Sequence, residues 1–259
     1  MMIDLHTHTV FCDGKNTPEE MVLSAIEKNI DVLGIAFHSY VPFDEGCCIK
    51  KDSEPQFIEE ISKLKEKYKN KISILCGVEQ DFHSGKPQYN FDYVIGSVHY
   101  LEKEGEHFSI DMDPALLKNL AKRYYEDDIY ALIEEYYQMV AIIPSATNAN
   151  VIGHFDLVSK FNEAGSLFDE QNPRYIRAYR RAIDRLISYN IPFEINTGAI
   201  SRKYRTTPYP SRDIIEYIKE KGGKFILSSD AHSANTLGFQ FKECEEMAKK
   251  LKLNLQKSI

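Results

Sequence analysis

The hydrophobic positions of this chain form short apolar runs that alternate with longer amphipathic stretches. Seven runs rich in Val, Ile, Leu and Phe predict strands, at residues 2–5, 32–37, 72–78, 93–98, 151–153, 193–196 and 224–228. Most of these runs lack the alternation of polar and apolar residues that a half-exposed strand shows. Continuous apolar runs are typical of a parallel sheet covered on both faces. The pattern therefore predicts strands in the centre of the fold.

The stretches between the runs carry helix signals. Thr17 precedes Pro18 and lies three residues before Glu20, which is the arrangement of a capping box with proline in the first turn. Apolar residues at helical spacing predict further helices within residues 57–64, 114–143, 176–187 and 211–218. Strands that alternate with helices predict an α/β fold, either a TIM-like (β/α) barrel or an open doubly wound sheet. Because no repeat or linker divides the chain, we expect a single domain over residues 1–259.

Composition narrows the possible partners. The net charge of -7 disfavours nucleic acid, whose phosphates an acidic surface repels. No apolar run approaches the ~20 residues of a membrane span, and the N-terminus does not resemble a signal peptide. The five cysteines are odd in number and form no CxxC pair, which fits a reducing cytoplasm. We therefore expect a cytoplasmic protein with a small-molecule partner, while its oligomeric state stays open.

Side chains of the types that bind metals gather just after the predicted strands. Nine of them follow six of the seven strands: His6, His8, Asp13, His38, Glu79, His99, His154, Asp230 and His232. If the strands are parallel, all these side chains emerge at one end of the sheet, which is the catalytic face of a barrel. Imidazoles and carboxylates are the ligands that Zn, Mn and Fe accept in proteins. The sequence therefore predicts a metal site at this end.

Two pairs among these residues have a spacing that suits one ion. His6 and His8 are separated by one residue, as are Asp230 and His232. Alternate residues of a strand point to the same side, so both members of a pair can bind together. A single His-x-His pair occurs by chance in many proteins, and the prediction depends on the joint pattern over six strands.

Other polar residues near this pattern have different expected roles. His83 and His107 fall in predicted loops, where we expect them to be exposed to solvent. Asp4, Asp81 and Asp156 lie close to predicted ligands, and a carboxylate in such a place can orient an imidazole by accepting a hydrogen bond from it.

The motifs formed by these residues resemble those of the polymerase and histidinol phosphatase (PHP) superfamily. They are His6-Thr7-His8-Thr9, Cys12-Asp13-Gly14, His38, Gly77-Val78-Glu79, Ser97-Val98-His99, Gly153-His154 and Ser229-Asp230-Ala231-His232. The resemblance extends from residue 3 to about residue 240. Within the superfamily, the segments 153–161, 194–197 and 208–211 resemble the branch of histidinol-phosphate phosphatases of histidine biosynthesis.

The resemblance implies a distorted seven-stranded (β/α) barrel with a centre of two to three divalent metal ions. It implies three ligand sets: His6, His8, Glu79 and Asp230 for one metal, Glu79, His99 and His154 for a second, and Asp13, His38 and His232 for a third. Some members of the superfamily have histidine where this chain has Asp13, so the occupancy of the third position stays open, as does the choice among Zn, Mn and Fe.

The activity that the resemblance implies is hydrolysis of a phosphate monoester. We expect a hydroxide that bridges two metals, with Glu79 shared between them, to attack phosphorus. Asp230 or His232 would pass a proton through a water to the leaving alkoxide. We expect Arg202 and Lys160 to bind the phosphate, because a phosphate dianion favours guanidinium and ammonium groups.

Three other functions remain open from the sequence. Another PHP-type phosphoesterase would act on phosphotyrosine, nucleotides or phosphomonoesters in general. A non-catalytic zinc module is disfavoured, because structural zinc sites are rich in cysteine and hold four ligands. An amidohydrolase also has a His-x-His pair after its first strand, but it usually supplies a bridging lysine where this chain has Glu79.

Overall fold

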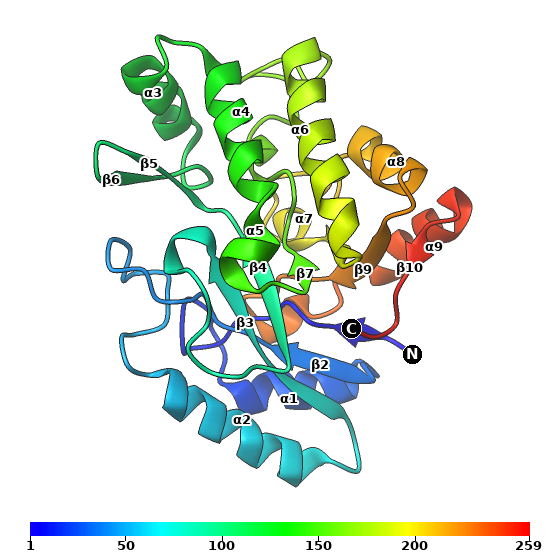
Figure 1. The fold of residues 1–259 in the computed structure, drawn as a ribbon. Helices are drawn as coiled ribbons and strands as arrows, with labels where there is room; N and C mark the ends of the chain where they lie inside the picture. The colour runs from blue at the N-terminus through cyan, green and yellow to red at the C-terminus, as the bar shows by residue number, and fades with distance from the viewer.

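The computed structural model describes all residues from 1 to 259, and its centre is a curled parallel sheet (Figure 1). The eight strands follow one another in the order β1 (Ile3–Asp4), β2 (Val32–Ile35), β3 (Ser73–Asp81), β4 (Tyr93–Ser97), β7 (Val151–Ile152), β8 (Pro192–Asn196), β9 (Lys224–Ser228) and β10 (Asn254–Leu255). This spatial order repeats the chain order without the reversal of a doubly wound sheet. The barrel-type fold predicted from the sequence is therefore confirmed.

The sheet closes where its strands end. Thr7, just beyond β1, pairs with Ala231, just beyond β9, and the backbone N–H of His8 donates to the Ala231 carbonyl at 2.8 Å. At the opposite end, β10 pairs with the first residues of β9, at Lys224 and Phe225. The seven predicted strands are all present, whereas β10 was not predicted because its two residues form no apolar run. Closure at the carboxyl ends brings the segment after β1 beside the segment after β9.

Helices cover the outside of the sheet (Figure 1). They are α1 (Pro18–Glu27), α2 (Glu54–Tyr68), α3 (Pro114–Tyr124), α4 (Ile129–Val140), α5 (Ile143–Thr147), α6 (Pro173–Leu186), α7 (Gly198–Ser201), α8 (Arg212–Glu220) and α9 (Phe241–Leu251). Short 3-10 turns are η1 (Phe82–Ser84), η2 (Leu157–Ser159), η3 (Ile187–Tyr189) and η4 (Ala234–Thr236). The capping box predicted at Thr17 is present. None of the helices has both the length and the apolar character that crossing a bilayer requires.

The interior of the barrel holds a small apolar layer beneath the site. Ile3, Leu5, Tyr93, Ile95, Val151 and Ile226 form this cluster, separate from the larger core between sheet and helices. Tyr93 is fully buried and donates a hydrogen bond to the carbonyl of Leu5. A Cβ at Gly77 would lie 2.0 Å from the Tyr93 ring, so glycine on β3 makes room for this side chain. The layer supports Glu79, which lies two residues after Gly77 on β3 and points to the same side of the strand.

An antiparallel hairpin lies outside the main sheet. Its strands are β5 (Tyr100–Lys103) and β6 (Glu106–Ser109), which form a separate two-stranded sheet. Figure 1 shows the hairpin next to α3, projecting from the body of the fold. The sequence did not predict it, because its strands have four residues each and carry few apolar side chains. The hairpin begins directly after His99 and so borders the predicted site.

Candidate metal centre

All nine predicted ligands converge at the carboxyl ends of the strands, around the carboxylates of Glu79 and Asp13. The sequence placed Glu79 just beyond β3, but the strand continues to Asp81, so Glu79 lies within it and points into the barrel. Its side chain is fully buried. Because β3 pairs with β2 on one side and β4 on the other, Glu79 is within reach of side chains at the ends of both strands.

One oxygen of Glu79 faces the histidines that follow β1 and β2. Its Oε2 lies 3.0 Å from Nε2 of His6, 3.4 Å from Nε2 of His8 and 2.9 Å from Nδ1 of His38. The rings of His6 and His8 therefore face the same carboxylate oxygen. His38 was predicted only in the group around Asp13, yet the structure places its ring between that group and Glu79.

The other oxygen of Glu79 faces the histidines that follow β4 and β7. Its Oε1 lies 2.8 Å from Nε2 of His154 and 3.4 Å from Nε2 of His99. The same oxygen accepts a hydrogen bond from the hydroxyl of Ser97 at 2.7 Å. The two oxygens of one carboxylate thus serve two different groups of imidazoles, which is the arrangement that a carboxylate shared by two metal ions requires.

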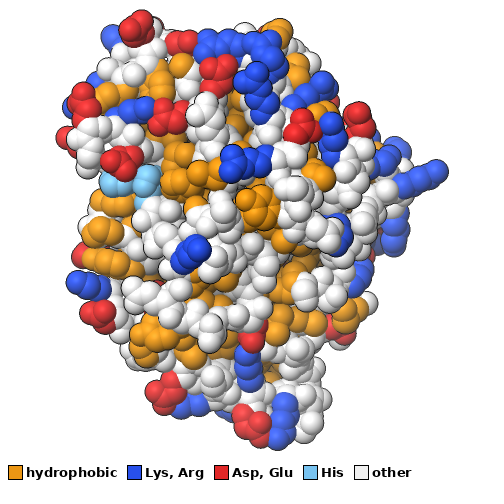
Figure 2. All heavy atoms as spheres, in the orientation of Figure 1, with side chains coloured by type: hydrophobic (Ala, Val, Ile, Leu, Met, Phe, Trp, Pro, Cys, Tyr) orange, Lys and Arg blue, Asp and Glu red, His pale blue; other side chains and the backbone are white.

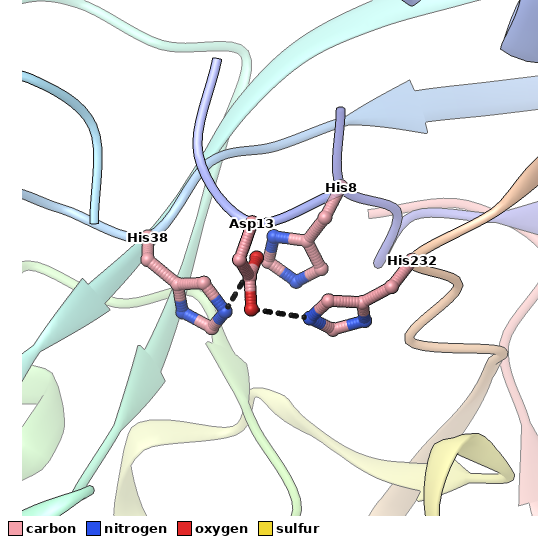
Figure 3. Close-up of side chains that lie close together, drawn as sticks. All are labelled: His8, Asp13, His38 and His232. Atoms are coloured by element: carbon pink, nitrogen blue, oxygen red, sulfur yellow. Dashed lines mark ion pairs between the residues drawn. The ribbon is translucent and has the colours of Figure 1, made fainter. Parts of the chain in front are cut away.

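Asp13 gathers a second group on the open side of the centre (Figure 3). Its Oδ1 lies 3.6 Å from Nε2 of His38, and its Oδ2 lies 3.1 Å from Nε2 of His232. The ring of His8 stacks on that of His38 at 4.2 Å and lies 4.4 Å from that of His232. Asp13 comes from a loop, whereas the ligands around Glu79 come from strands and strand ends.

Asp230 joins the two groups and carries a backbone conformation that few residues adopt. Its φ is 49°, in the left-handed region, where a non-glycine residue is uncommon and clusters at functional sites. Its Oδ1 lies 3.6 Å from Nε2 of His8 and 3.5 Å from Nδ1 of His232. Its Oδ2 accepts from the guanidinium of Arg202 at 3.0 Å.

Three polar atoms at the heart of the centre are buried without a hydrogen-bond partner. They are Nε2 of His6, Nε2 of His8 and Oε2 of Glu79. Buried polar atoms are almost always paired, because leaving one unpaired is costly. These three atoms converge on one another, and a divalent cation between them would satisfy all three. Nitrogen and oxygen donors of this kind fit Zn, Mn or Fe.

The charges around the two histidines after β1 act in opposite directions. Burial alone would lower the pKa of His6, but three nearby carboxylates raise it well above its usual value. These carboxylates belong to Glu194, Glu79 and Asp230. Burial and the neighbouring imidazoles hold the pKa of His8 well below its usual value. These three carboxylates thus attract positive charge, and a divalent ion can take the place of the proton.

Glu194 on β8 is a residue of the centre that the sequence analysis missed. Its Oε1 lies 2.8 Å from Nδ1 of His6, and its Oε2 accepts from the backbone N–H of His154 at 3.0 Å. A carboxylate behind an imidazole sets which ring nitrogen carries the proton and leaves the other for a metal. The signal available was a charged residue between Phe193 and Ile195, inside a strand buried on both faces.

The three aspartates predicted to orient imidazoles have different hydrogen-bond partners in the structure. Asp81 does so, because its Oδ2 lies 3.1 Å from Nδ1 of His99. The prediction is wrong for Asp4, which accepts hydrogen bonds from Ser229 and Gly238 instead. It is also wrong for Asp156, which accepts from the backbone of Ser211 and from Ser159. Both carboxylates hold loops together, since their chain positions are near the ligands but their side chains point elsewhere.

A cavity of about 310 Å³ opens above the centre. Both predicted phosphate-binding residues line it, but neither cation is free. Arg202 donates to the side chain and the backbone carbonyl of Asp230, and Lys160 donates to the side chain and carbonyl of Asp111. Asp44, whose Oδ2 accepts from the hydroxyl of Tyr100 at 2.8 Å, also lines the cavity. The cavity therefore offers both positive and negative groups beside the centre.

Two histidines lie apart from the centre. His83 is in η1 and His107 is in β6, so neither lies in the open loops that the sequence suggested. Both are half-buried, and their rings lie 4.6 Å apart. The predicted exposure is therefore only partial, because the hairpin folds back onto the turn after β3.

Comparisons with known proteins agree with this geometry. Over 93% of this chain and 90% of its own length, a probable histidinol-phosphatase of Deinococcus radiodurans is 29% identical. The histidinol-phosphatase of Bacillus subtilis is 27% identical over 92% of this chain and 96% of its own length. A crystal structure of histidinol phosphate phosphatase from Lactococcus lactis, complexed with zinc, L-histidinol and phosphate, has a TM-score of 0.72 at 20% identity. It covers all of this chain and 96% of its own.

A family model described as the PHP domain matches residues 4–198. This match covers most of the chain and includes seven of the nine side chains gathered around Glu79 and Asp13. The two remaining side chains, Asp230 and His232, join the same cluster through the closure of the barrel. The chain belongs to the PHP domain family.

Proposed function

We propose that residues 1–259 form one PHP-type phosphoesterase domain that hydrolyses L-histidinol phosphate to L-histidinol and phosphate. The observation that carries the proposal is the set of buried, unpartnered atoms of His6, His8 and Glu79 at the mouth of a barrel of this family. Relatives that align with nine-tenths of the chain are named histidinol-phosphatases, which supports the choice of substrate. The cysteines, all free, support a place in the reducing cytoplasm.

Three groups of side chains would hold two to three divalent ions. The groups are His6, His8, Glu79 and Asp230, then Glu79, His99 and His154, and lastly Asp13, His38 and His232. The distances around Glu79 support a shared carboxylate between the first two groups, and the place of Asp13 between two imidazoles supports the third. When bound, such ions neutralise phosphate oxygens and lower the pKa of a water to roughly 7.

Arg202 and Lys160 would hold the phosphate above these groups. Both line the cavity, and each is positioned by a carboxylate, Arg202 by Asp230 and Lys160 by Asp111. A guanidinium or ammonium group held in this way loses less freedom when it binds an anion. Glu79, Asp230 and His232 would serve the reaction directly, with Asp230 or His232 passing a proton through a water to the leaving alkoxide.

The cavity also suits the positive end of histidinol phosphate. Its lining includes Asp44, which Tyr100 holds by a hydrogen bond. A carboxylate there would pair with the ammonium group of the substrate. Asp81 also lines the cavity but is already bonded to His99, whereas the nearby Glu45, Tyr40 and Phe82 do not line it.

Substrate profiling at equal metal content tests the proposal. The purified protein is loaded with Zn, Mn or Fe and assayed on histidinol phosphate, phosphotyrosine, a nucleoside monophosphate and p-nitrophenyl phosphate. We expect kcat/KM for histidinol phosphate to exceed the others by more than about tenfold, which is about 1.4 kcal/mol of discrimination. A preference for phosphotyrosine or the nucleotide would assign the chain to another PHP-type phosphoesterase.

Removal of metal tests the chemistry separately from the substrate. Dialysis against a chelator should abolish hydrolysis of all four esters, and restoring divalent metal should recover it. Full activity in protein shown to be metal-free by elemental analysis would overturn the metal-dependent mechanism, whichever ester is preferred.

A further inference from the structure

The hairpin β5–β6 brings together a second set of metal-binding side chains that shares no residue with the centre. Glu102 and His107 are direct partners in the pairing of the two strands, and Nε2 of His107 lies 3.8 Å from Oε2 of Glu102. The turn η1 adds His83, whose ring lies 4.6 Å from that of His107. One ligand atom from each of the three residues lies within 4.8 Å of the other two. Figure 2 shows imidazole groups at the surface on the side of the hairpin.

The two imidazoles are held in place by other residues. The ring of Phe43 stacks on that of His107, with centroids 3.7 Å apart and planes at 6°. Nε2 of His83 lies 3.2 Å from the carbonyl oxygen of Tyr100, to which it can donate a hydrogen bond. A backbone carbonyl on one ring nitrogen is a usual partner of a metal-binding histidine, because it fixes the proton there and leaves a lone pair on the other. The ligands are therefore partly preorganised.

The chemistry of this set matches zinc. Two imidazoles and one carboxylate form a known ligand set for zinc, with a fourth position left for water. Zinc binds the neutral imidazole, and its binding releases any proton that the ring carries. The two imidazoles and the Glu102 carboxylate thus supply three of the four ligands that zinc takes.

We propose that His83, Glu102 and His107 form a peripheral zinc site, independent of the centre around Glu79. The site joins the turn after β3 to the hairpin, two segments otherwise linked here by a hydrogen bond to a backbone carbonyl. Because Glu102 is half exposed and both imidazoles are only half-buried, the site binds zinc more weakly than the buried centre. Because Tyr100 lines the cavity and holds His83, zinc in this site also steadies one wall of the cavity.

A zinc titration of the metal-loaded protein tests the proposal. Protein with a filled centre is equilibrated with rising zinc, and bound zinc is counted by elemental analysis after passage through a desalting column and by calorimetry. We expect the wild type to bind one more equivalent than the double variant His83→Ala/His107→Ala. Glu102→Gln should weaken this last equivalent by at least tenfold. Glu106→Gln, which removes a carboxylate from the same hairpin outside the ligand set, should bind zinc as the wild type does.

A second measurement keeps the test decisive if the double variant folds poorly. Wild-type crystals soaked in zinc, with diffraction recorded on both sides of the zinc absorption edge, should show an anomalous peak between His83, Glu102 and His107. Equal zinc content in the wild type and a folded double variant would overturn the proposal, as would crystals without that peak at saturating zinc. Neither result depends on which phosphate ester the enzyme hydrolyses, so failure here leaves the proposed function unaffected.

Discussion

The centre has two halves that differ in burial and in origin. We call inner half the residues His6, His8, Glu79, His154 and Asp230, and outer half the residues Asp13, His38 and His232. The side chains of the inner half are 0% to 6% exposed, and those of the outer half are 19% to 29% exposed. His99, the ninth residue of the centre, lies between the two ranges at 13%. Inner residues rest on the packed interior of the barrel, whereas outer residues are partly exposed at the cavity.

This difference indicates that the two halves depend on bound metal to different degrees. The inner half has buried atoms without partners and the carboxylate of Glu194, which bonds the imidazole of His6 and the backbone N–H of His154. Such atoms are costly to bury, so we expect the inner half to depend on bound ions. The outer half already pairs Asp13 with His38 and His232, and solvent reaches all three. We expect inner ions to be retained through purification and the outer ion to exchange.

The largest effect should come from Glu79→Gln in the inner half. The variant removes the negative charge and places an amide N–H among imidazole nitrogens, so it disrupts both groups that share Glu79. We expect a loss of kcat/KM of about a thousandfold or more, roughly 4 kcal/mol, and a fall in bound metal of at least one equivalent. Kinetics on histidinol phosphate and elemental analysis provide the measurement. The control is Glu59→Gln on α2, and a variant with full metal and activity would refute a shared carboxylate.

Glu194→Gln should have the next largest effect, again confined to the inner half. The variant retains the side-chain shape but weakens the partner of His6 Nδ1. Loss of such a partner costs about 10- to 100-fold in metal affinity or activity. Competition with a chelator should show weaker retention of the inner ions and unchanged binding of the outer ion. Equal weakening of both would mean that Glu194 supports the fold and not the inner half in particular.

Asp13→Asn should separate the outer half from the inner half. We expect the loss of one metal equivalent and a decrease in kcat/KM of about tenfold, or 1.4 kcal/mol. The inner ions should stay, because Asp13 makes no contact with Glu79. The exposed Asp31→Asn serves as control. A complete loss of metal in Asp13→Asn would show that the two halves bind as one unit.

Gly198→Ala should have the smallest effect and acts on the boundary between the halves. A Cβ there would lie 2.6 Å from Oδ2 of Asp230 and 2.9 Å from Nη2 of Arg202, so it would push this ion pair apart. We expect KM to rise by about fivefold, or about 1 kcal/mol, with metal content unchanged. Gly46→Ala is the matched control, since its Cβ would lie 3.7 Å from the closest atom. An unchanged KM would argue against a role for Arg202 in binding phosphate.

The sequence predicted the parts of this molecule that depend on local patterns. Continuous apolar runs located β1 to β4 and β7 to β9, because a strand buried on both faces needs apolar residues throughout. The capping box at Thr17 was also predicted correctly, because it depends on residues close together in the chain. The hairpin was not predicted, because its strands are short and half exposed and therefore form no apolar run. Its folding onto η1, which half-buries His83 and His107, depends on contacts that no local pattern reports.

The sequence by itself determined the fold class and the identity of the ligand types, since both follow from which residues occur at strand ends. Only the tertiary structure decided how they are grouped. It placed Glu79 between two sets of imidazoles, turned Asp4 and Asp156 away from the centre, and brought Glu194 to His6 across 188 positions of the chain. The physical reason is barrel closure between Thr7 and Ala231, which joins distant strand ends and leaves no trace in local periodicity.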